Sequence, residues 1–252
     1  MIRSTMRRWS IAAALVTWLV VSASQVAGLT IATELIGVTE ARSVYPEIDG
    51  VDDVTGAAQR IAVLDTGIDF DHPGFAGRVV AGINYAAGGE YGSKLATYWS
   101  DGNGHGTSVA GIVGSSWDGA LGVTPEIELV SVRVLADNGE GSFDDVVRGL
   151  QWVNDHAAEL NITAVNLSLG SDRTYDAPGD VPNYWYMSGM RQALDALEAK
   201  GVITVAASGN SGSTSGLSMP AILDDTISVG GASKSDGVGL YSNRSDALDL
   251  LG

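Results

Sequence analysis

Short apolar runs alternate with amphipathic stretches along most of the chain. Five runs rich in Val, Ile, Leu and Ala are bounded by Gly, Asp or Asn, and each is predicted to be a buried strand: residues 61–64, 129–135, 164–167, 202–206 and 227–229. Two stretches between these runs have helical patterns. One opens with Ser142 and Asp145, which resemble a capping box, and runs to about Ala158, whereas the other spans residues 188–200 and stops at Gly201.

This alternation determines the predicted fold class. Parallel strands need long crossover connections, which are almost always right-handed, so the order strand, helix, strand predicts an α/β fold with a parallel sheet and helices on both faces. Residues 172–186, with Pro178, Pro182 and several aromatic side chains, are predicted to form a surface excursion between a strand and a helix. No internal repeat or linker interrupts the pattern, which indicates one globular domain.

The N-terminal residues indicate where the protein is targeted. Arg3, Arg7 and Arg8 precede an apolar run over residues 11–21, and small residues follow that run. This layout is typical of a secretory signal peptide, and we expect residues 1–27 to be removed and residues 28–252 to form the mature domain. The protein is then expected to be secreted or to reside in the cell envelope. An uncleaved N-terminal anchor is the alternative.

Composition narrows the classes of partner. The chain has 30 acidic and 14 basic residues, a formal net charge of −16, so it is expected to repel nucleic acid and anionic lipid. We therefore expect no nucleic-acid partner and no membrane contact beyond the signal segment. The chain has no cysteine, which excludes disulfides, thiolate zinc sites and thiol nucleophiles.

Polar residues with catalytic chemistry follow three of the predicted strands. Asp65, Ser168 and Asn210 each come just after a strand, and the carboxyl ends of parallel strands meet at one rim, where ligands bind in such sheets. His105 is predicted to join this rim. It lies in a glycine-rich loop, residues 101–106, after which Thr107 or Ser108 is expected to open a helix.

Taken singly, these residues leave alternatives open. Asp65 can orient an imidazole, but an aspartate at a strand end can also cap a helix, bind a metal ion or accept a phosphoryl group. His105 can be a general base, a structural residue or a metal ligand. The Asn210 amide can stabilise an oxyanion or occupy a left-handed turn.

Four motifs in one order carry a resemblance. The segments Asp65-Thr-Gly-Ile-Asp69, His105-Gly-Thr107, Asn166-Leu-Ser-Leu-Gly170 and Ala206-Ala-Ser-Gly-Asn210 resemble those of the subtilisin-like serine proteases, the subtilases or peptidase S8 family. The resemblance runs from about Val38 to the last residue. It implies a subtilisin-like, three-layer fold and the activity of a serine endopeptidase.

The resemblance also assigns roles to the site residues. It implies that Asp65 orients the imidazole, that His105 is the base and then the acid, and that Asn210 is an oxyanion-hole donor. It further implies that two edge segments hold an extended polypeptide substrate as an added strand, through residues Gly139, Gly141, Ser168, Leu169 and Gly170. We expect the protein to act as a monomer.

No cofactor is expected, and calcium is doubtful. Many relatives have an aspartate after the His-Pro pair, where this chain has Gly74, and a longer loop than residues 115–121. Asp69, Asp71 and Asp118 are interpreted as turn and surface residues, although carboxylates of this kind could form another hard-cation site.

The family's nucleophile has no counterpart here. In the family it lies in a Gly-Thr-Ser-x-Ala-x-Pro segment well after the oxyanion asparagine, and no such segment follows Asn210. We expect the domain to be incomplete at its C-terminus and this chain alone to be inactive. Ser108 lies in a similar string directly after His105, but Gly111 stands where the proline belongs, and Ser108 is interpreted as part of the histidine helix.

Three hypotheses about function follow. The first is that the chain is part of an exported serine endopeptidase. The second is that it is a catalytically inactive relative that binds extended peptides without cleaving them. The third is a metal-dependent hydrolase that uses Asp65, His72 and His105, for which the ligand set is thin.

Overall fold

The structure is a computed structural model that describes residues 33–34, 36–45, 49–51, 58–87, 90–233, 235 and 237–252. The predicted signal segment, residues 1–27, lies outside these residues. No helix within the described ranges has the length and apolar character needed to cross a bilayer.

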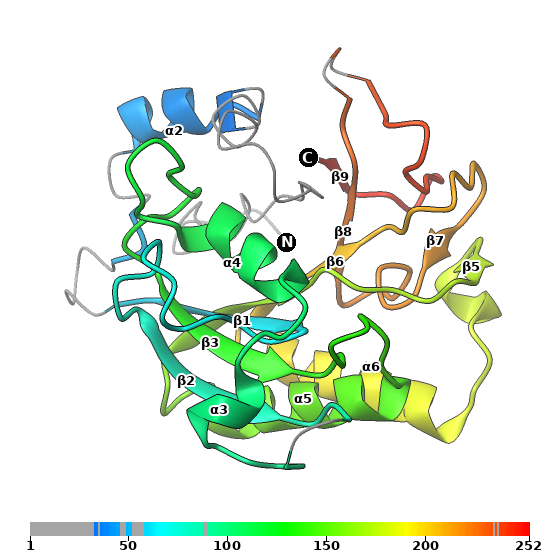
Figure 1. The fold of residues 1–252 in the computed structure, drawn as a ribbon. Helices are drawn as coiled ribbons and strands as arrows, with labels where there is room; N and C mark the ends of the chain where they lie inside the picture. The colour runs from blue at the N-terminus through cyan, green and yellow to red at the C-terminus, as the bar shows by residue number, and fades with distance from the viewer. Residues whose placement is uncertain are drawn as a thin grey trace.

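Seven strands form one parallel sheet, in the spatial order β2-β3-β1-β4-β6-β8-β9 (Figure 1). Their bounds are β1 (Arg60–Asp65), β2 (Val79–Asn84), β3 (Glu128–Arg133), β4 (Ile162–Leu167), β6 (Ile203–Ala207), β8 (Ile227–Gly230) and β9 (Leu250–Leu251). A separate antiparallel pair joins β5 (Thr174–Tyr175) to β7 (Leu217–Ser218). The predicted parallel sheet is confirmed, and its central strands are the runs with the strongest apolar pattern.

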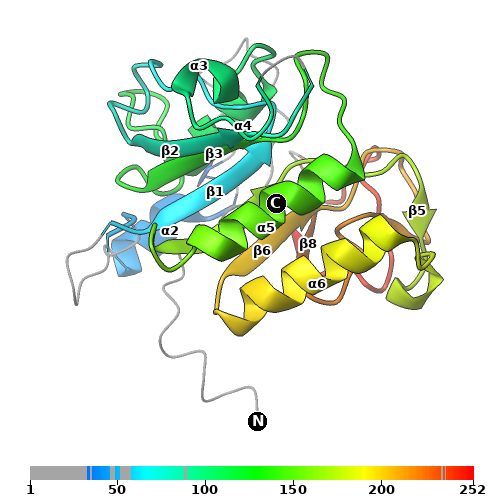
Figure 2. The same cartoon turned by 90° about the horizontal axis from the view of Figure 1, so that it is seen from below.

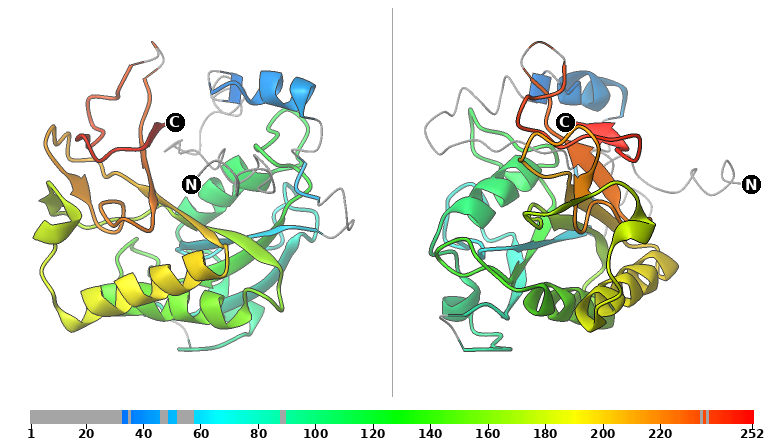
Figure 3. Two further views of the ribbon diagram at one scale, coloured as in Figure 1. Left: turned by 180° about the vertical axis from the view of Figure 1, so that it is seen from behind. Right: turned by 90° about the vertical axis from the view of Figure 1, so that its right-hand side faces the viewer.

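The helices cover both faces of the sheet. On one face, α5 (Phe143–His156) and α6 (Trp185–Ala199) lie side by side, as Figure 2 shows, while α4 (His105–Gly114) lies on the opposite face (Figure 3). Two short helices, α2 (Val38–Val44) and α3 (Ala96–Trp99), and a 3-10 turn, Pro178–Asp180, complete the described elements. The three-layer, subtilisin-like α/β architecture predicted from the sequence is therefore confirmed.

Alternation along the strands divides the core into two clusters. In β1, Ile61 and Val63 point to the α4 side, whereas Ala62 and Leu64 point to the side of α5 and α6. All four side chains are at most 2% exposed. Burying one such aliphatic side chain contributes about 1.5–3 kcal/mol, so the runs that face helices on both sides hold the sheet together.

Helix α5 begins where the sequence predicts. The Ser142 hydroxyl oxygen accepts a hydrogen bond from the Asp145 N–H at 3.1 Å, which satisfies one of the free amides at the helix start and contributes about 1 kcal/mol. The helix then buries Val146, Leu150 and Val153, three or four residues apart, against the sheet.

Several boundaries differ from the predictions. Helix α6 begins at Trp185, three residues earlier than predicted, so the excursion over residues 172–186 contains β5, the 3-10 turn and the start of α6. Helix α4 begins at His105 rather than at Thr107 or Ser108, because Gly104 occupies the N-cap position. The predicted strand 129–135 ends at Arg133, where the chain turns toward the rim of the sheet.

Candidate active site

Asp65 is the last residue of β1 and is fully buried at the carboxyl rim of the sheet. Its Oδ1 accepts hydrogen bonds from the Thr66 N–H, at 2.7 Å, and from the His105 Nδ1–H, also at 2.7 Å. An ionised carboxylate only accepts hydrogen bonds, so this contact fixes the proton of the neutral imidazole on Nδ1.

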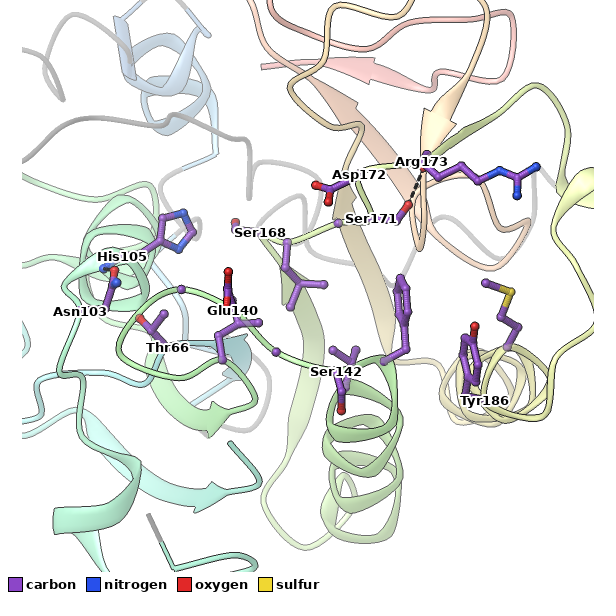
Figure 4. Close-up of a pocket in the computed structure, with 18 of the residues that line it drawn as sticks. Thr66, Asn103, His105, Glu140, Ser142, Ser168, Ser171, Asp172, Arg173 and Tyr186 are labelled. Carbon is purple, nitrogen blue, oxygen red and sulfur yellow. Dashed lines mark hydrogen bonds between the residues drawn. The ribbon is translucent and has the colours of Figure 1, made fainter. Parts of the chain in front are cut away.

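His105 is the first residue of α4, and Gly106 allows it to come close to β1. A Cβ atom at position 106 would overlap the Gly67 carbonyl oxygen and would lie 3.1 Å from the Asp65 Cβ. Only glycine therefore lets the helix start approach the strand end this closely. The His105 side chain stays 36% exposed, and its ring faces the cleft in Figure 4. Its Nε2 is the nitrogen left to exchange a proton with a substrate or a nucleophile.

The environment raises the pKa of His105 above its ordinary value of 6.5. The hydrogen bond to Asp65 is the largest cause; burial opposes it, and the charges of Asp65 and Asp101 add to the increase. An imidazole held beside a buried carboxylate is stabilised when it becomes protonated, as a general base must be during acyl transfer.

This shift gives an expected pH dependence of stability. Because the folded-state pKa of His105 is raised, the stability that its charged form contributes is fully present below about pH 6.5 and is lost as the pH rises through the folded-state pKa. The difference in unfolding free energy between the wild type and His105→Gln should therefore be larger at about pH 5.5 than at about pH 9. Urea unfolding at the two pH values measures it, and an equal or reversed difference would contradict the assignment.

A cleft of about 850 Å³ begins at His105 and runs between two segments. One segment carries Gly139 and Gly141, and the other carries Ser168, Leu169 and Gly170. Figure 4 labels Glu140 in the first segment and Ser168 in the second. The structure thus brings the five predicted substrate-contact residues into one cleft together with the histidine. The two walls are the ends of the loops that follow β3 and β4.

Polar side chains fix the first wall of the cleft. The Asn103 Nδ2–H donates to the Asp137 carbonyl oxygen at 2.7 Å, and the Arg133 Nη2–H donates to the Asp137 Oδ1 at 2.8 Å. The Arg133 side chain is only 7% exposed and also donates to the carbonyl oxygens of Tyr98 and Ser100. The wall is therefore tied to β3, to the histidine loop, to α3 and to the residue that follows α3.

Aromatic residues at the far end of the cleft were not predicted to belong to the site. Phe143 and Tyr186 stack with ring centroids 5.9 Å apart, and Tyr184 stacks on Tyr186 at 5.7 Å. All three line the cleft. The aromatic residues of the excursion were noticed in the sequence, but nothing in it indicated that they meet a residue of α5.

Asn210 lies outside the lining of this cleft. It is exposed in the loop that follows β6, at the same rim of the sheet. The loop is held by the fully buried Asn243, which sequence reasoning missed. Asn243 Oδ1 accepts from the N–H groups of Ser211 and Ser213, at 3.1 and 3.0 Å, and from the Ser211 hydroxyl at 2.8 Å.

Two other residues raised by the sequence take structural contacts. The Ser108 hydroxyl donates to the Gly104 carbonyl oxygen at 2.8 Å, within its own helix start, as the interpretation of Ser108 requires. His72 Nδ1 accepts from the Gly74 N–H at 3.1 Å, and its ring packs against Phe75 and Trp117. Among the described residues, no three His, Asp or Glu side chains are grouped so that they could hold a metal ion. The ligand set of Asp65, His72 and His105 is therefore not assembled.

Comparisons with known proteins identify similar chains in one family. The family described as the subtilase family, Peptidase_S8, matches residues 56–251. Subtilisin-like protease 3 of Pseudogymnoascus destructans is 34% identical over 203 residues, and subtilisin DY of Bacillus licheniformis is 31% identical over 201 residues. The major intracellular serine protease of Bacillus subtilis is 34% identical over 205 residues.

The matches cover most of this chain but only part of the relatives. They include 78% to 79% of this chain and 44% to 64% of the length of these three relatives. The crystal structure of a cold adapted subtilisin-like serine proteinase is similar with a TM-score of 0.61 at 29% identity. That similarity covers 81% of this chain and 63% of the crystallised one.

Proposed function

The chain belongs to the subtilase family of subtilisin-like serine proteases, and on that premise we propose that Asp65, His105 and Asn210 are the base and oxyanion-hole parts of a serine endopeptidase site. The observation that carries the proposal is the 2.7 Å contact between His105 Nδ1 and the buried Asp65 carboxylate at the head of a cleft. Histidines beside carboxylates are common in proteins. The Asp65–His105 pair, however, lies at the start of a cleft between two glycine-containing walls, and this position favours a catalytic role over a structural one.

The proposed chemistry assigns one step to each residue. Asp65 keeps the imidazole in the tautomer that leaves Nε2 free and stabilises the imidazolium. His105 takes the proton of a nucleophilic hydroxyl as that oxygen attacks the peptide carbonyl carbon, and returns the proton to the leaving amine. Asn210 donates its side-chain N–H to the oxyanion of the tetrahedral intermediate, a contribution of about 2.7–4 kcal/mol in enzymes of this chemistry.

The proposed substrate is an extended polypeptide. A peptide in the cleft would add a strand between the 139–141 and 168–170 segments, and main-chain hydrogen bonds would supply affinity with little dependence on sequence. Glycines at 139, 141 and 170 leave the main chain of both walls accessible. Folded proteins are then poor substrates unless a segment unfolds locally.

We further propose that the nucleophile is none of the serines in these 252 residues. Among the described residues, the only side chain that hydrogen-bonds the His105 ring is Asp65. Ser168 lines the cleft, but its hydroxyl oxygen accepts from the Asn166 Nδ2–H at 2.9 Å and belongs to a buried pair. Peptide binding without cleavage is the second candidate function, because the cleft has both walls and no hydroxyl of the described residues hydrogen-bonds the imidazole.

Determining the coding sequence past the codon for Gly252 separates the two functions. A Gly-Thr-Ser-x-Ala-x-Pro segment there, together with peptidase activity of the whole gene product that is lost when its serine becomes alanine, supports the endopeptidase. A stop codon at that point, with binding of extended peptides and no cleavage, supports the second function. Cleavage that survives His105→Ala would contradict both.

We also propose that the protein is exported and acts as a monomer. The basic, apolar and small-residue segments at the N-terminus support export. N-terminal sequencing of exported material should find a start between Ser24 and Gly28, whereas an intact Met1 found only in membranes would indicate an anchor. Analytical ultracentrifugation of the purified chain tests whether its mass in solution is that of a monomer.

Calcium is expected to affect stability little. Gly74 stands where many relatives have an aspartate, and the loop over residues 115–121 is short. An ion that binds only the native state raises stability by RT ln(1 + [L]/Kd), so a specific site would raise the melting temperature as calcium is added. Thermal melts with millimolar calcium and with a chelator should agree to within about 5 °C. A larger difference would show a site that this reasoning misses.

A further inference from the structure

Asp101 is the most heavily hydrogen-bonded carboxylate around the histidine, and the proposed chemistry gives it no role. Its Oδ1 accepts from the Thr66 hydroxyl and from the N–H groups of Asn103 and Gly104, each at 2.9 Å. Its Oδ2 accepts from the Thr107 N–H at 2.9 Å and from the Thr107 hydroxyl at 2.6 Å. Both oxygens are thus occupied by groups that flank His105 or Asp65.

These contacts join the two elements that carry the catalytic pair. Thr66 directly follows Asp65, and its hydroxyl oxygen also accepts from the Gly106 N–H at 2.9 Å. The chain of contacts therefore runs from the end of β1 through Thr66 to Asp101 and to the first turn of α4. Thr107 extends it, because its hydroxyl oxygen accepts from the Asp69 N–H at 3.0 Å.

We propose that Asp101 is a positioning residue for His105: it holds the end of β1 and the start of α4 in contact, and it supplies a second negative charge near the imidazole. The inference rests on the proposed function of His105 as the base. Asp101 makes no hydrogen bond to the imidazole ring. It acts through the loop and the helix start that carry His105.

The charge of Asp101 is kept by its hydrogen bonds. Burial by itself raises the pKa of this carboxyl, but the hydrogen bonds from Thr107, Gly104 and Asn103 outweigh burial and lower the pKa below 3.8. Asp101 is therefore ionised at any pH at which His105 titrates. The charged groups that face the ring are Asp65 from β1 and Asp101 from its own loop, and Glu140 lines the same cleft from the opposite wall.

The test uses the 252-residue chain and needs no turnover. In Asp101→Asn, the amide nitrogen cannot accept the hydrogen bonds that one carboxylate oxygen receives, and the charge is lost. The titration midpoint of the His105 ring, followed by NMR, should fall below that of the wild type. Hydrogen-exchange protection of the Gly104 amide or of the Thr107 amide, whichever loses its acceptor oxygen, should fall about tenfold or more, which corresponds to the loss of one hydrogen bond to a charged group.

A matched control separates position from net charge. Asp71→Asn removes an exposed carboxylate nearby that makes no contact with the histidine loop, and it should leave both readouts as in the wild type. Thr107→Val keeps the Asp101 charge but removes both hydrogen bonds of the Thr107 hydroxyl, the one it donates to Asp101 and the one it accepts from the Asp69 N–H. It should therefore lower the amide protection and leave the His105 midpoint close to that of the wild type. If Asp101→Asn does not fold, Thr66→Val and Thr107→Val are measured for the same loss of protection.

The proposal is wrong if folded Asp101→Asn matches Asp71→Asn in both the His105 midpoint and the amide protection. It is also wrong if Asp101→Asn does not fold and both threonine variants keep wild-type protection. Failure of the endopeptidase proposal has a different signature, because a gene product without peptidase activity leaves the His105 titration and its response to Asp101 unchanged.

Discussion

The 252-residue chain, purified alone, is expected to show no serine-protease turnover and to take no covalent label from a fluorophosphonate. Asp65 orients His105, and Asn210 is proposed to donate to an oxyanion, but an acyl-enzyme forms only if a hydroxyl lies within hydrogen-bond reach of the imidazole. Sites of this kind that lack their nucleophile retain about 10³ to 10⁴-fold catalysis over water, which is orders of magnitude below a working protease.

The measurement is mass spectrometry of the chain after incubation with the probe, alongside a peptide-hydrolysis assay. His105→Ala is the matched control, because trace activity from a contaminating protease would be the same in both samples. Stoichiometric labelling of the wild type that maps to Ser108 and is lost in His105→Ala would contradict the account. It would then require Ser108 to leave its hydrogen bond with Gly104.

Replacing Asn243 with alanine is expected to lower the free energy of unfolding by about 2–5 kcal/mol. The side chain is fully buried, and its oxygen accepts three hydrogen bonds from Ser211 and Ser213. Its nitrogen donates to the Ser208 carbonyl oxygen at 3.0 Å and to the Ser218 hydroxyl at 3.2 Å. Alanine leaves the buried Ser218 hydroxyl and the part-buried amides of Ser211 and Ser213 without this partner, whereas the Ser208 carbonyl oxygen still accepts from the Ser218 N–H at 2.9 Å. Each buried unpaired group costs about 1–3 kcal/mol.

The same variant should loosen the loop that carries Asn210. Urea unfolding gives the stability, and hydrogen exchange of the Ser211 and Ser213 amides reports the loop. Asn138→Ala is the control, since Asn138 is exposed in a turn and should change stability by less than about 0.5 kcal/mol. If Asn243→Ala were no less stable than Asn138→Ala, this network would not hold the loop that carries Asn210.

The sequence predicted the strands that are buried on both faces and missed those at the sheet edges. Residues 61–64 are apolar throughout, and residues 164–167 are apolar except for the buried Asn166, because α4 covers one face of the sheet and α5 and α6 cover the other. Strand β2 lies at one edge, exposes Val80 and contains Gly82, where a Cβ would overlap the Trp99 ring. Strand β9 has only two residues, both exposed, so it has no periodicity to detect.

Within the site, residues carried by local motifs were predictable and those that act through tertiary contacts were not. Asp65 and His105 each stand in a recognisable segment, as do the two walls of the cleft. Asn243 lies 35 residues after Ser208, so no local pattern links the two. Asp101 has local partners in Asn103, Gly104 and Thr107, but its contact with Thr66 spans 35 residues and is likewise not indicated by a local pattern. The aromatic end of the cleft depends in the same way on contact between α5 and α6.

The proposed function requires that the cleft headed by the Asp65–His105 pair bind an extended polypeptide between its two walls. Titrating the isotopically labelled 252-residue chain with an unlabelled, extended peptide, followed by NMR, tests this claim most directly. The account predicts saturable shifts in the amides of residues 139–141 and 168–170 and in the His105 ring, with the rest of the sheet unchanged. Saturating peptide that moves neither wall nor the ring, or that shifts only residues elsewhere, would contradict it.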